Sequence, residues 1–147
     1  MSLSDLSIQI QDRKVQKIYG LSSCTGEIKI GEFRETFISP LDWWTIEDYE
    51  KQWQDGIDRI KHCNESCLVT MAQNLETSPQ IDWWILYKKN GKVLIYNQLL
   101  IDEIIGQLKY KIENLSQFTP QTCYSYIPPY KLFAKNSKAS KWEITLE

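Results

Sequence analysis

The sequence predicts an α+β fold with antiparallel strands and two or three helices, in a single domain spanning residues 1–147. Three observations predict it. Several short segments alternate apolar and polar residues, as strands with one buried face do. One longer segment repeats apolar residues every three or four positions, as an amphipathic helix does. The run Lys89-Asn90-Gly91-Lys92 has the composition of a tight turn between two antiparallel strands.

The first strands are expected before a proline. Residues 6–10 alternate clearly, and residues 15–19 either pair with them or lead into a loop at 20–23. Residues 27–30 and 32–37 alternate again, with Gly31 as a bend between them. Pro40 is expected to end this strand region.

The best-defined helix follows this proline. Thr45 is a good N-cap, and carboxylates at Glu47 and Asp48 complement the dipole of the first turn. The apolar stripe predicts a helix over 46–62. Gly56 lies in its interior and indicates close packing there, because glycine otherwise weakens a helix.

The second half is expected to continue with strands at 66–73, 81–87 and 92–97, of which 83–87 is apolar on both faces and therefore central. Residues 100–115 have helical apolar spacing, although Gly106 and β-branched residues oppose a helix. Thr119-Pro120 starts a short helix that ends by Ile127. Residues 135–140 are polar and expected to be mobile, and 142–146 form a last strand.

Charge is unevenly distributed along the chain. Residues 27–58 hold nine acidic side chains against three basic ones, whereas residues 88–141 hold nine lysines against three acids. Such asymmetry can steer association with a charged partner. It is equally compatible with two solvated faces that only keep the protein dissolved.

The chain is expected to be cytoplasmic. Its first residues lack the basic and apolar regions of a secretory signal, and no apolar run approaches the roughly 20 residues of a membrane span. In such a protein, Cys24, Cys63, Cys67 and Cys123 are expected to be free thiols.

Catalytic and metal-binding patterns are missing. His62 is the single histidine and falls at the end of the predicted helix, where histidine commonly caps carbonyl groups. Cys63 and Cys67 do not have the C-x-x-C spacing of a zinc site. We therefore expect no enzyme activity, no metal and no cofactor.

Binding of single-stranded nucleic acid is the alternative function, because aromatic rings beside lysines can stack on bases. A net charge of −2 and a pI near 5.5 oppose it. The candidate residues would be Trp83, Trp84, Tyr87, Tyr124, Tyr126, Tyr130 and the C-terminal lysines.

One pattern of aromatic residues indicates a protein family. Pro40-Leu41-x-Trp43-Trp44-x-Ile46-x-Asp48-Tyr49-x-x-x-Trp53 resembles immunity proteins of bacterial contact-dependent growth inhibition systems, in the branch paired with ribosomal-RNA nuclease toxins. The resemblance continues at Trp84-x-Leu86-Tyr87, Lys92-Val93, Phe118-Thr119-Pro120 and Lys138-x-Ser140-x-Trp142. The chain departs from the pattern between residues 98 and 117, where it is longer.

The resemblance implies a curved antiparallel β-sheet with packed helices, and a non-catalytic inhibitor. Such a protein would bind the C-terminal domain of its cognate toxin one to one in the cytoplasm. Nuclease toxins are commonly basic because they hold a phosphate backbone, so an acidic inhibitor surface would suit them.

The matched aromatic residues are expected in the core: Trp43, Trp44, Tyr49, Trp53, Trp84 and Tyr87. The partner-binding residues are expected among the exposed acids: Glu32, Glu35, Asp42, Glu47, Asp48, Glu50, Asp55 and Asp58. Helical spacing allows Glu47, Glu50 and Asp58 or Gln54 to share one face.

Overall fold

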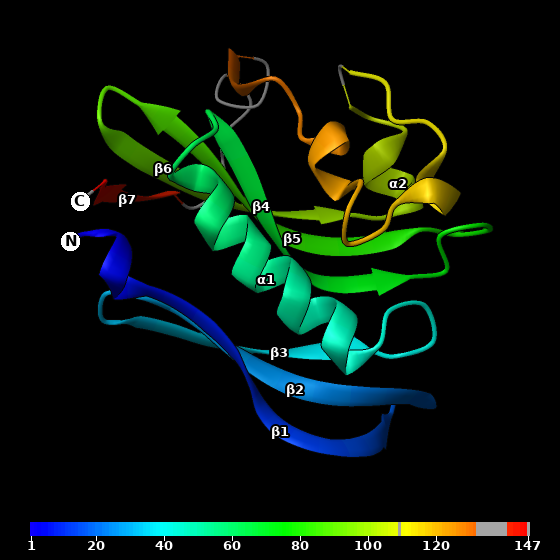
Figure 1. The fold of residues 1–147 in the computed structure, drawn as a ribbon. Coiled ribbons are helices and arrows are strands. Elements are labelled where there is room, and N and C mark those ends of the chain that lie inside the picture. Colours follow the sequence, from blue (N-terminus) through cyan, green and yellow to red (C-terminus); the bar gives the residue numbers. More distant parts are fainter. Residues whose placement is uncertain (109, 132–140, 147) are drawn as a thin grey trace.

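The computed structural model describes residues 1–108, 110–131 and 141–146 (Figure 1). The strands are β1 (Leu6–Ile18), β2 (Leu21–Ile30), β3 (Phe33–Pro40), β4 (Glu65–Gln73), β5 (Gln80–Lys89), β6 (Lys92–Leu100) and β7 (Lys141–Thr145). The α-helices are α1 (Ile46–Ile60) and α2 (Asp102–Ile105), and the 3-10 helices are η1 (Leu3–Asp5), η2 (Leu115–Gln117) and η3 (Cys123–Tyr126).

The strands form two antiparallel sheets, in the orders β1-β2-β3 and β4-β5-β6-β7. The α+β class and the antiparallel pairing are confirmed, with the strands divided between two sheets. β1 is much longer than the segment 6–10 that alternation predicts, and it includes residues 15–18, which belong to the same strand and do not pair with residues 6–10. Its register shifts after Ile10 and again after Asp12, and such bulges break the period of two on which the prediction depends.

Three local predictions are confirmed. β3 ends at Pro40, and α1 begins directly after Thr45. In the β5–β6 hairpin, Asn90 and Gly91 both have positive φ, at 53° and 75°, as a type I′ turn requires. None of the helices in the described part of the chain is long and apolar enough to cross a membrane.

Residues 100–115, for which helical spacing and Gly106 gave opposite indications, are helical only in part. β6 continues to Leu100, α2 is a single turn, and the described residues from 107 to 114 contain no helix. Ile105 packs against the core from the end of α2, and Leu108 and Ile112 pack against it from the irregular segment that follows. Their spacing therefore reflects docking of a loop, and Gly106 marks where the helical turn stops.

The final elements follow the prediction more closely. The segment after Thr119 forms the short 3-10 helix η3, which ends before Ile127 as expected. It starts later than Pro120 because the hydroxyls of Thr119 and Thr122 bond each other at 2.9 Å and shape a preceding turn. β7 confirms the predicted last strand, whereas residues 135–140 lie outside the described residues.

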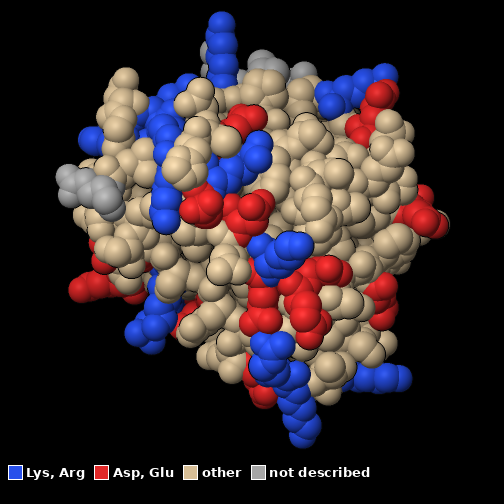
Figure 2. Space-filling model, in the orientation of Figure 1, with Lys and Arg blue, Asp and Glu red and all other residues tan. Residues whose placement is uncertain are grey.

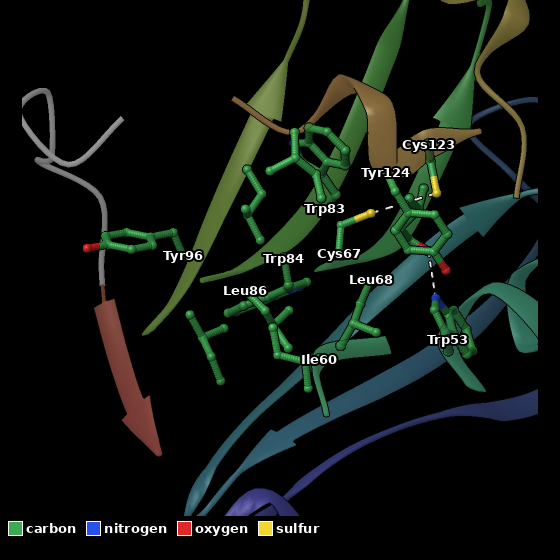
Figure 3. Packing of buried hydrophobic residues seen from close by; sticks show 14 of the residues in the cluster. Trp53, Ile60, Cys67, Leu68, Trp83, Trp84, Leu86, Tyr96, Cys123 and Tyr124 are labelled. Atoms are coloured by element: carbon green, nitrogen blue, oxygen red, sulfur yellow. Dashed lines mark hydrogen bonds between the residues drawn. The ribbon is translucent and has the colours of Figure 1, made fainter. Parts of the chain in front are cut away.

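The centre of the core is β5 (Figure 3). All five residues from Trp83 to Tyr87 are almost fully buried, which confirms the central strand. The ring of Trp83 meets Phe118 from the segment after β6, at 5.6 Å between centroids. On the opposite face Trp84 meets Trp142 of β7 at 5.2 Å and Phe33 of β3 at 6.0 Å. The two sheets therefore share one core.

Of the six aromatic residues predicted in the core, five are buried and Trp43 is not. Trp43 keeps 36% of its surface exposed, whereas Trp44 keeps 2%. The Trp44 ring stacks on Phe118, and its Nε1 donates to the Phe118 carbonyl at 3.4 Å. Trp43 and Trp44 are adjacent residues in the bent connection between β3 and α1, and only one of the two faces the interior.

Helix α1 packs against β4, which is an edge strand of its sheet. The Tyr49 hydroxyl donates to the Pro40 carbonyl at 2.7 Å and accepts from the Ala72 amide at 3.2 Å. Trp53 Nε1 donates to the Val69 carbonyl at 2.6 Å. Side chains of the helix thus bond to the backbone of β4. This packing fixes which face of α1 points outward.

Candidate partner-binding surface

The outer face of α1 carries most of the predicted acids. Tyr49, Gln52, Trp53, Gly56 and Ile60 are buried on the inner face, so the opposite side of the helix points to solvent. The exposed charged side chains are Glu47, Lys51, Asp55, Asp58 and Lys61. In Figure 2, acidic patches lie over the centre of the displayed face and are interrupted by basic side chains. The surface is therefore mixed in sign.

Asp48 serves the helix start. Its carboxylate accepts from the Thr45 amide at 2.9 Å, and its own amide donates to the Thr45 hydroxyl at 3.1 Å. This reciprocal pair is a capping box, which satisfies two backbone donors that the helix cannot. Asp48 is half-buried, and its first role is in the fold.

Glu47 and Glu50 meet a basic residue from the first sheet. Arg13 of β1 lies 2.8 Å from Glu50 and 3.8 Å from Glu47. The hydrogen bond to Glu50 raises the pKa of the Arg13 guanidinium. Both ion pairs are solvent-exposed, so they contribute little stability but cancel part of the acidic potential.

Asp55 and Asp58 also have partners. The Tyr124 hydroxyl of η3 donates to the Asp55 carboxylate at 2.6 Å. Burial, and then this bond, raise the pKa of Tyr124, while the Arg59 guanidinium lies 4.4 Å from the centre of its ring. Asp58 forms an ion pair with Lys61 at 3.8 Å. Asp55 thus helps to hold η3 against the helix.

The remaining three acids are exposed, and they are not together. Glu32 lies in the turn between β2 and β3, at the opposite end of the molecule from the start of α1 (Figure 1). Glu35 is on β3, opposite Ile28 of β2. Asp42 lies in the connection that leads into α1. The eight predicted acids therefore do not form one face, and Asp42, Glu47, Asp48 and Glu50 are the group gathered at the helix start.

Two open grooves border the helix. One of about 240 Å³ lies between β1 and α1 and is lined by Ile8, Gln9, Glu50, Trp53, Gln54 and Ile57. A larger one of about 610 Å³ runs over the outer face and is lined by Lys51, Gln54, Asp55, Ile57, Asp58 and Lys61. Both are lined by charged and polar groups along with apolar ones. They suit contact with a protein surface better than enclosure of a small molecule.

Sequence reasoning missed the residues that β1 brings to this surface. Arg13 reaches α1 because β1 continues beyond Ile10, which the broken alternation concealed. Tyr19 forms the tip of the β1–β2 hairpin and is 95% exposed. The Tyr19-Gly20 dipeptide was the available signal, since glycine after a loop residue often marks a two-residue turn.

The structure buries most of the aromatic residues that the nucleic-acid alternative requires, whereas Tyr126 and Tyr130 stay partly exposed. Trp83, Trp84 and Tyr87 are at most 1% exposed and cannot stack on a base. His62 is exposed just beyond α1, and Cys67 is buried beside Cys123 at 3.7 Å between sulfurs. The described residues contain no group of three or more His, Cys, Asp or Glu that could hold a metal ion. The absence of catalysis stays a prediction.

Comparison with known proteins identifies the family. The family model of the CdiI N-terminal domain matches residues 39–147. The chain belongs to this family. The matched part contains α1 and the whole second sheet, and β1 and β2 precede it. The predicted resemblance to immunity proteins of contact-dependent growth inhibition is thereby confirmed, while the ribosomal-RNA nuclease branch stays a prediction.

Two relatives of this CdiI-family chain come from Enterobacter cloacae. One is a protein named Immunity protein CdiI, from Enterobacter cloacae subsp. cloacae, which is 27% identical over 93 residues. That match spans 62% of this chain and 62% of the relative's own length. The other is a chain of the CdiA-CT/CdiI toxin and immunity complex, with a TM-score of 0.71, 21% identity, and coverage of 95% of this chain and 90% of that one. At this sequence identity, the structural similarity shows a shared fold only.

Proposed function

We propose that this chain is an immunity protein that binds and neutralises the cognate toxin domain of a contact-dependent growth inhibition system. The observation that carries the proposal is the CdiI family match over residues 39–147. The Enterobacter cloacae relative is named an immunity protein, which supports the same activity, and the structural neighbour from a toxin and immunity complex supports the fold. The surface around α1, with grooves lined by mixed charges, is compatible with a protein partner.

We propose further that the toxin is a basic nuclease and that the inhibitor acts on it one to one in the cytoplasm, without catalysis or a cofactor. Nucleases hold a phosphate backbone with lysine and arginine, so a complementary acidic surface speeds their capture. The excess of acids between residues 27 and 58 supports this. The chain would act as a single domain over 1–147, because Phe33 and Phe37 of the first sheet pack on Trp84 and Trp53.

Co-expression tests the proposal. The probe is the C-terminal domain of the large secreted protein whose gene lies next to the gene of this chain. Cells that make this toxin domain alone should stop growing, and cells that also make the present chain should grow. The purified proteins should elute as a 1:1 complex. Continued growth arrest in the presence of the folded chain would rule out the proposed function.

A further inference from the structure

Two tight hairpins of this chain, β5–β6 and β1–β2, have both turn residues at positive φ but use different residues there. In the β5–β6 hairpin, Asn90 and Gly91 have φ of 53° and 75°; in the β1–β2 hairpin, Tyr19 and Gly20 have φ of 52° and 80°. Each turn has two residues, since Lys89 pairs with Lys92 and Ile18 pairs with Leu21. Asparagine tolerates positive φ well, whereas a bulky aromatic residue there is a steric outlier.

Within the described part of the chain, the Tyr19 side chain gains no packing that offsets its positive φ. Its side chain is 95% exposed, so the ring buries almost no surface in the fold. An asparagine in the same backbone conformation is already used at position 90. For folding alone, therefore, tyrosine is the poorer choice at position 19. A residue that strains its own turn and gains no internal packing is a candidate for a contact outside the chain.

Other exposed apolar side chains lie at the same end. Val15 of β1 is 54% exposed and Trp43 is 36% exposed. The Leu41 amide donates to the Ser22 carbonyl at 2.8 Å, which places the segment with Trp43 beside the β1–β2 turn. Figure 1 shows this turn and the β3–α1 connection at one end of the molecule. Tyrosine and tryptophan are the residue types that most often dominate binding energy at protein interfaces.

Charge around Trp43 indicates what covers this end. Asp42, Glu47, Asp48 and Glu50 surround the helix start, and Arg13 is paired with two of them. At the helix start three acidic charges therefore remain in excess, while Lys14 and Lys17 are exposed on β1 near the Tyr19 turn. Apolar anchors with an acidic border fit a protein partner whose facing surface combines apolar and basic groups.

We propose that Tyr19 and Trp43 are the apolar anchors with which this chain holds its toxin domain, and that Tyr19 is kept for binding at the expense of stability. This rests on the proposed function and goes beyond it, because it locates the docking surface at the hairpin end and not on the acidic face of α1 as a whole. Val15 extends the apolar patch, and Asp42 and Glu47 border it.

The test is the variant Tyr19→Asn, which copies the turn of the other hairpin. It should unfold at higher urea concentration than the wild type, yet bind the catalytically inactivated toxin domain about tenfold or more weakly. Trp43→Ala should weaken binding to a similar extent. Leu99→Asn, which removes a 42% exposed apolar side chain from the other sheet, should leave affinity unchanged.

Each other outcome overturns the proposal. If the wild type binds the toxin domain and Tyr19→Asn binds equally well, the docking surface is wrong although the function stands. If the wild type does not bind the toxin domain, both the proposed function and the proposed docking surface are wrong. A loss of stability in Tyr19→Asn would refute the strain argument. If the wild type forms a dimer in sedimentation and Tyr19→Asn does not, the surface binds a second copy of the chain. If the wild type binds an oligonucleotide and Tyr19→Asn does not, the surface binds nucleic acid.

Discussion

The side chain of Gln52 and the backbone of Val69 pair as two strands of a sheet would. Gln52 Oε1 accepts from the Val69 amide at 2.7 Å, while Gln52 Nε2 donates to the Cys67 carbonyl at 2.7 Å. One side-chain amide on α1 thus satisfies a donor and an acceptor on the outer edge of β4. Together with Tyr49 and Trp53, it lets the helix take the place of a fifth strand.

Replacing Gln52 should therefore be costly. Gln52→Ala leaves a buried amide and a buried carbonyl without partners, and we expect the free energy of unfolding to fall by about 2–4 kcal/mol. Urea unfolding followed by tryptophan fluorescence measures the change. The exposed neighbour Gln54 is the control, because Gln54→Ala should change stability by less than about 0.5 kcal/mol. Equal effects of the two variants would contradict the role assigned to Gln52.

Gly56 should not tolerate even one methyl group. A Cβ there would lie 2.4 Å from the Cys67 carbonyl oxygen, and the Gly56 carbonyl also accepts from the Ser66 hydroxyl at 2.6 Å. Alanine favours a helix over glycine by about 1 kcal/mol. We nevertheless expect Gly56→Ala to destabilise the protein by about 1–3 kcal/mol, because backbone must move. A variant as stable as the wild type would show that helix and strand are not in such close contact.

The four thiols should differ sharply in reactivity. Cys24, Cys67 and Cys123 are buried, and burial raises the pKa of Cys67 and Cys24, which keeps them as unreactive neutral thiols. Cys63 is partly exposed. With an aromatic disulfide reagent near pH ~8, one thiol should react quickly in the native protein and all four in denaturant. Cys63→Ser should remove the fast reaction, and fast modification of the Cys67–Cys123 pair would contradict their burial.

Alkaline pH should unfold the protein before its buried tyrosines ionise. Burial, followed by its hydrogen bond with Tyr130, raises the pKa of Tyr96 to about 12, and burial also raises the pKa of Tyr49. An unfolded tyrosine ionises near pH ~10, so above that pH the unfolded chain releases protons that the folded chain retains. Stability should therefore fall as pH rises from about 10 toward 12. Urea midpoints that stay constant over this range would refute the expectation.

Charges at the start of α1 should control the rate of toxin capture if the partner is basic. Glu47→Lys with Glu50→Lys should slow association several-fold, whereas Arg13→Ala frees both carboxylates and should speed it. Both effects should shrink at high salt. Surface-plasmon kinetics measure them. Glu143→Lys, a charge reversal on β7, is the control, and an equal effect per reversed charge there would mean that only net charge matters.

Elements could be predicted from the sequence where a few neighbouring residues determine the backbone conformation by themselves. The Thr45 N-cap, the Asn90-Gly91 turn and the apolar run at 83–87 each specify their structure within a few residues. Two kinds of feature were beyond such rules. Bulges hid the second half of β1, and tertiary docking of Leu108 and Ile112 imitated helical spacing.

The candidate surface was harder to predict than the fold. Which acids are neighbours depends on how β1 crosses the start of α1, and a long-range contact such as Arg13–Glu50 has no local signature. The roles of Asp48 in the cap and Asp55 with Tyr124 likewise appear only in three dimensions. Exposed acids could be named from the sequence, but their grouping could not.

Closure of the β4 edge by helix side chains also bears on self-association. An uncovered strand border offers unpaired amides and carbonyls on which another copy can build a continuous sheet. Gln52, Tyr49 and Trp53 occupy those groups on β4. Fraying of α1 would therefore loosen the packing of the core and also expose the β4 edge as a template for fibre growth. Variants of these three residues should aggregate faster than their free energies of unfolding alone suggest.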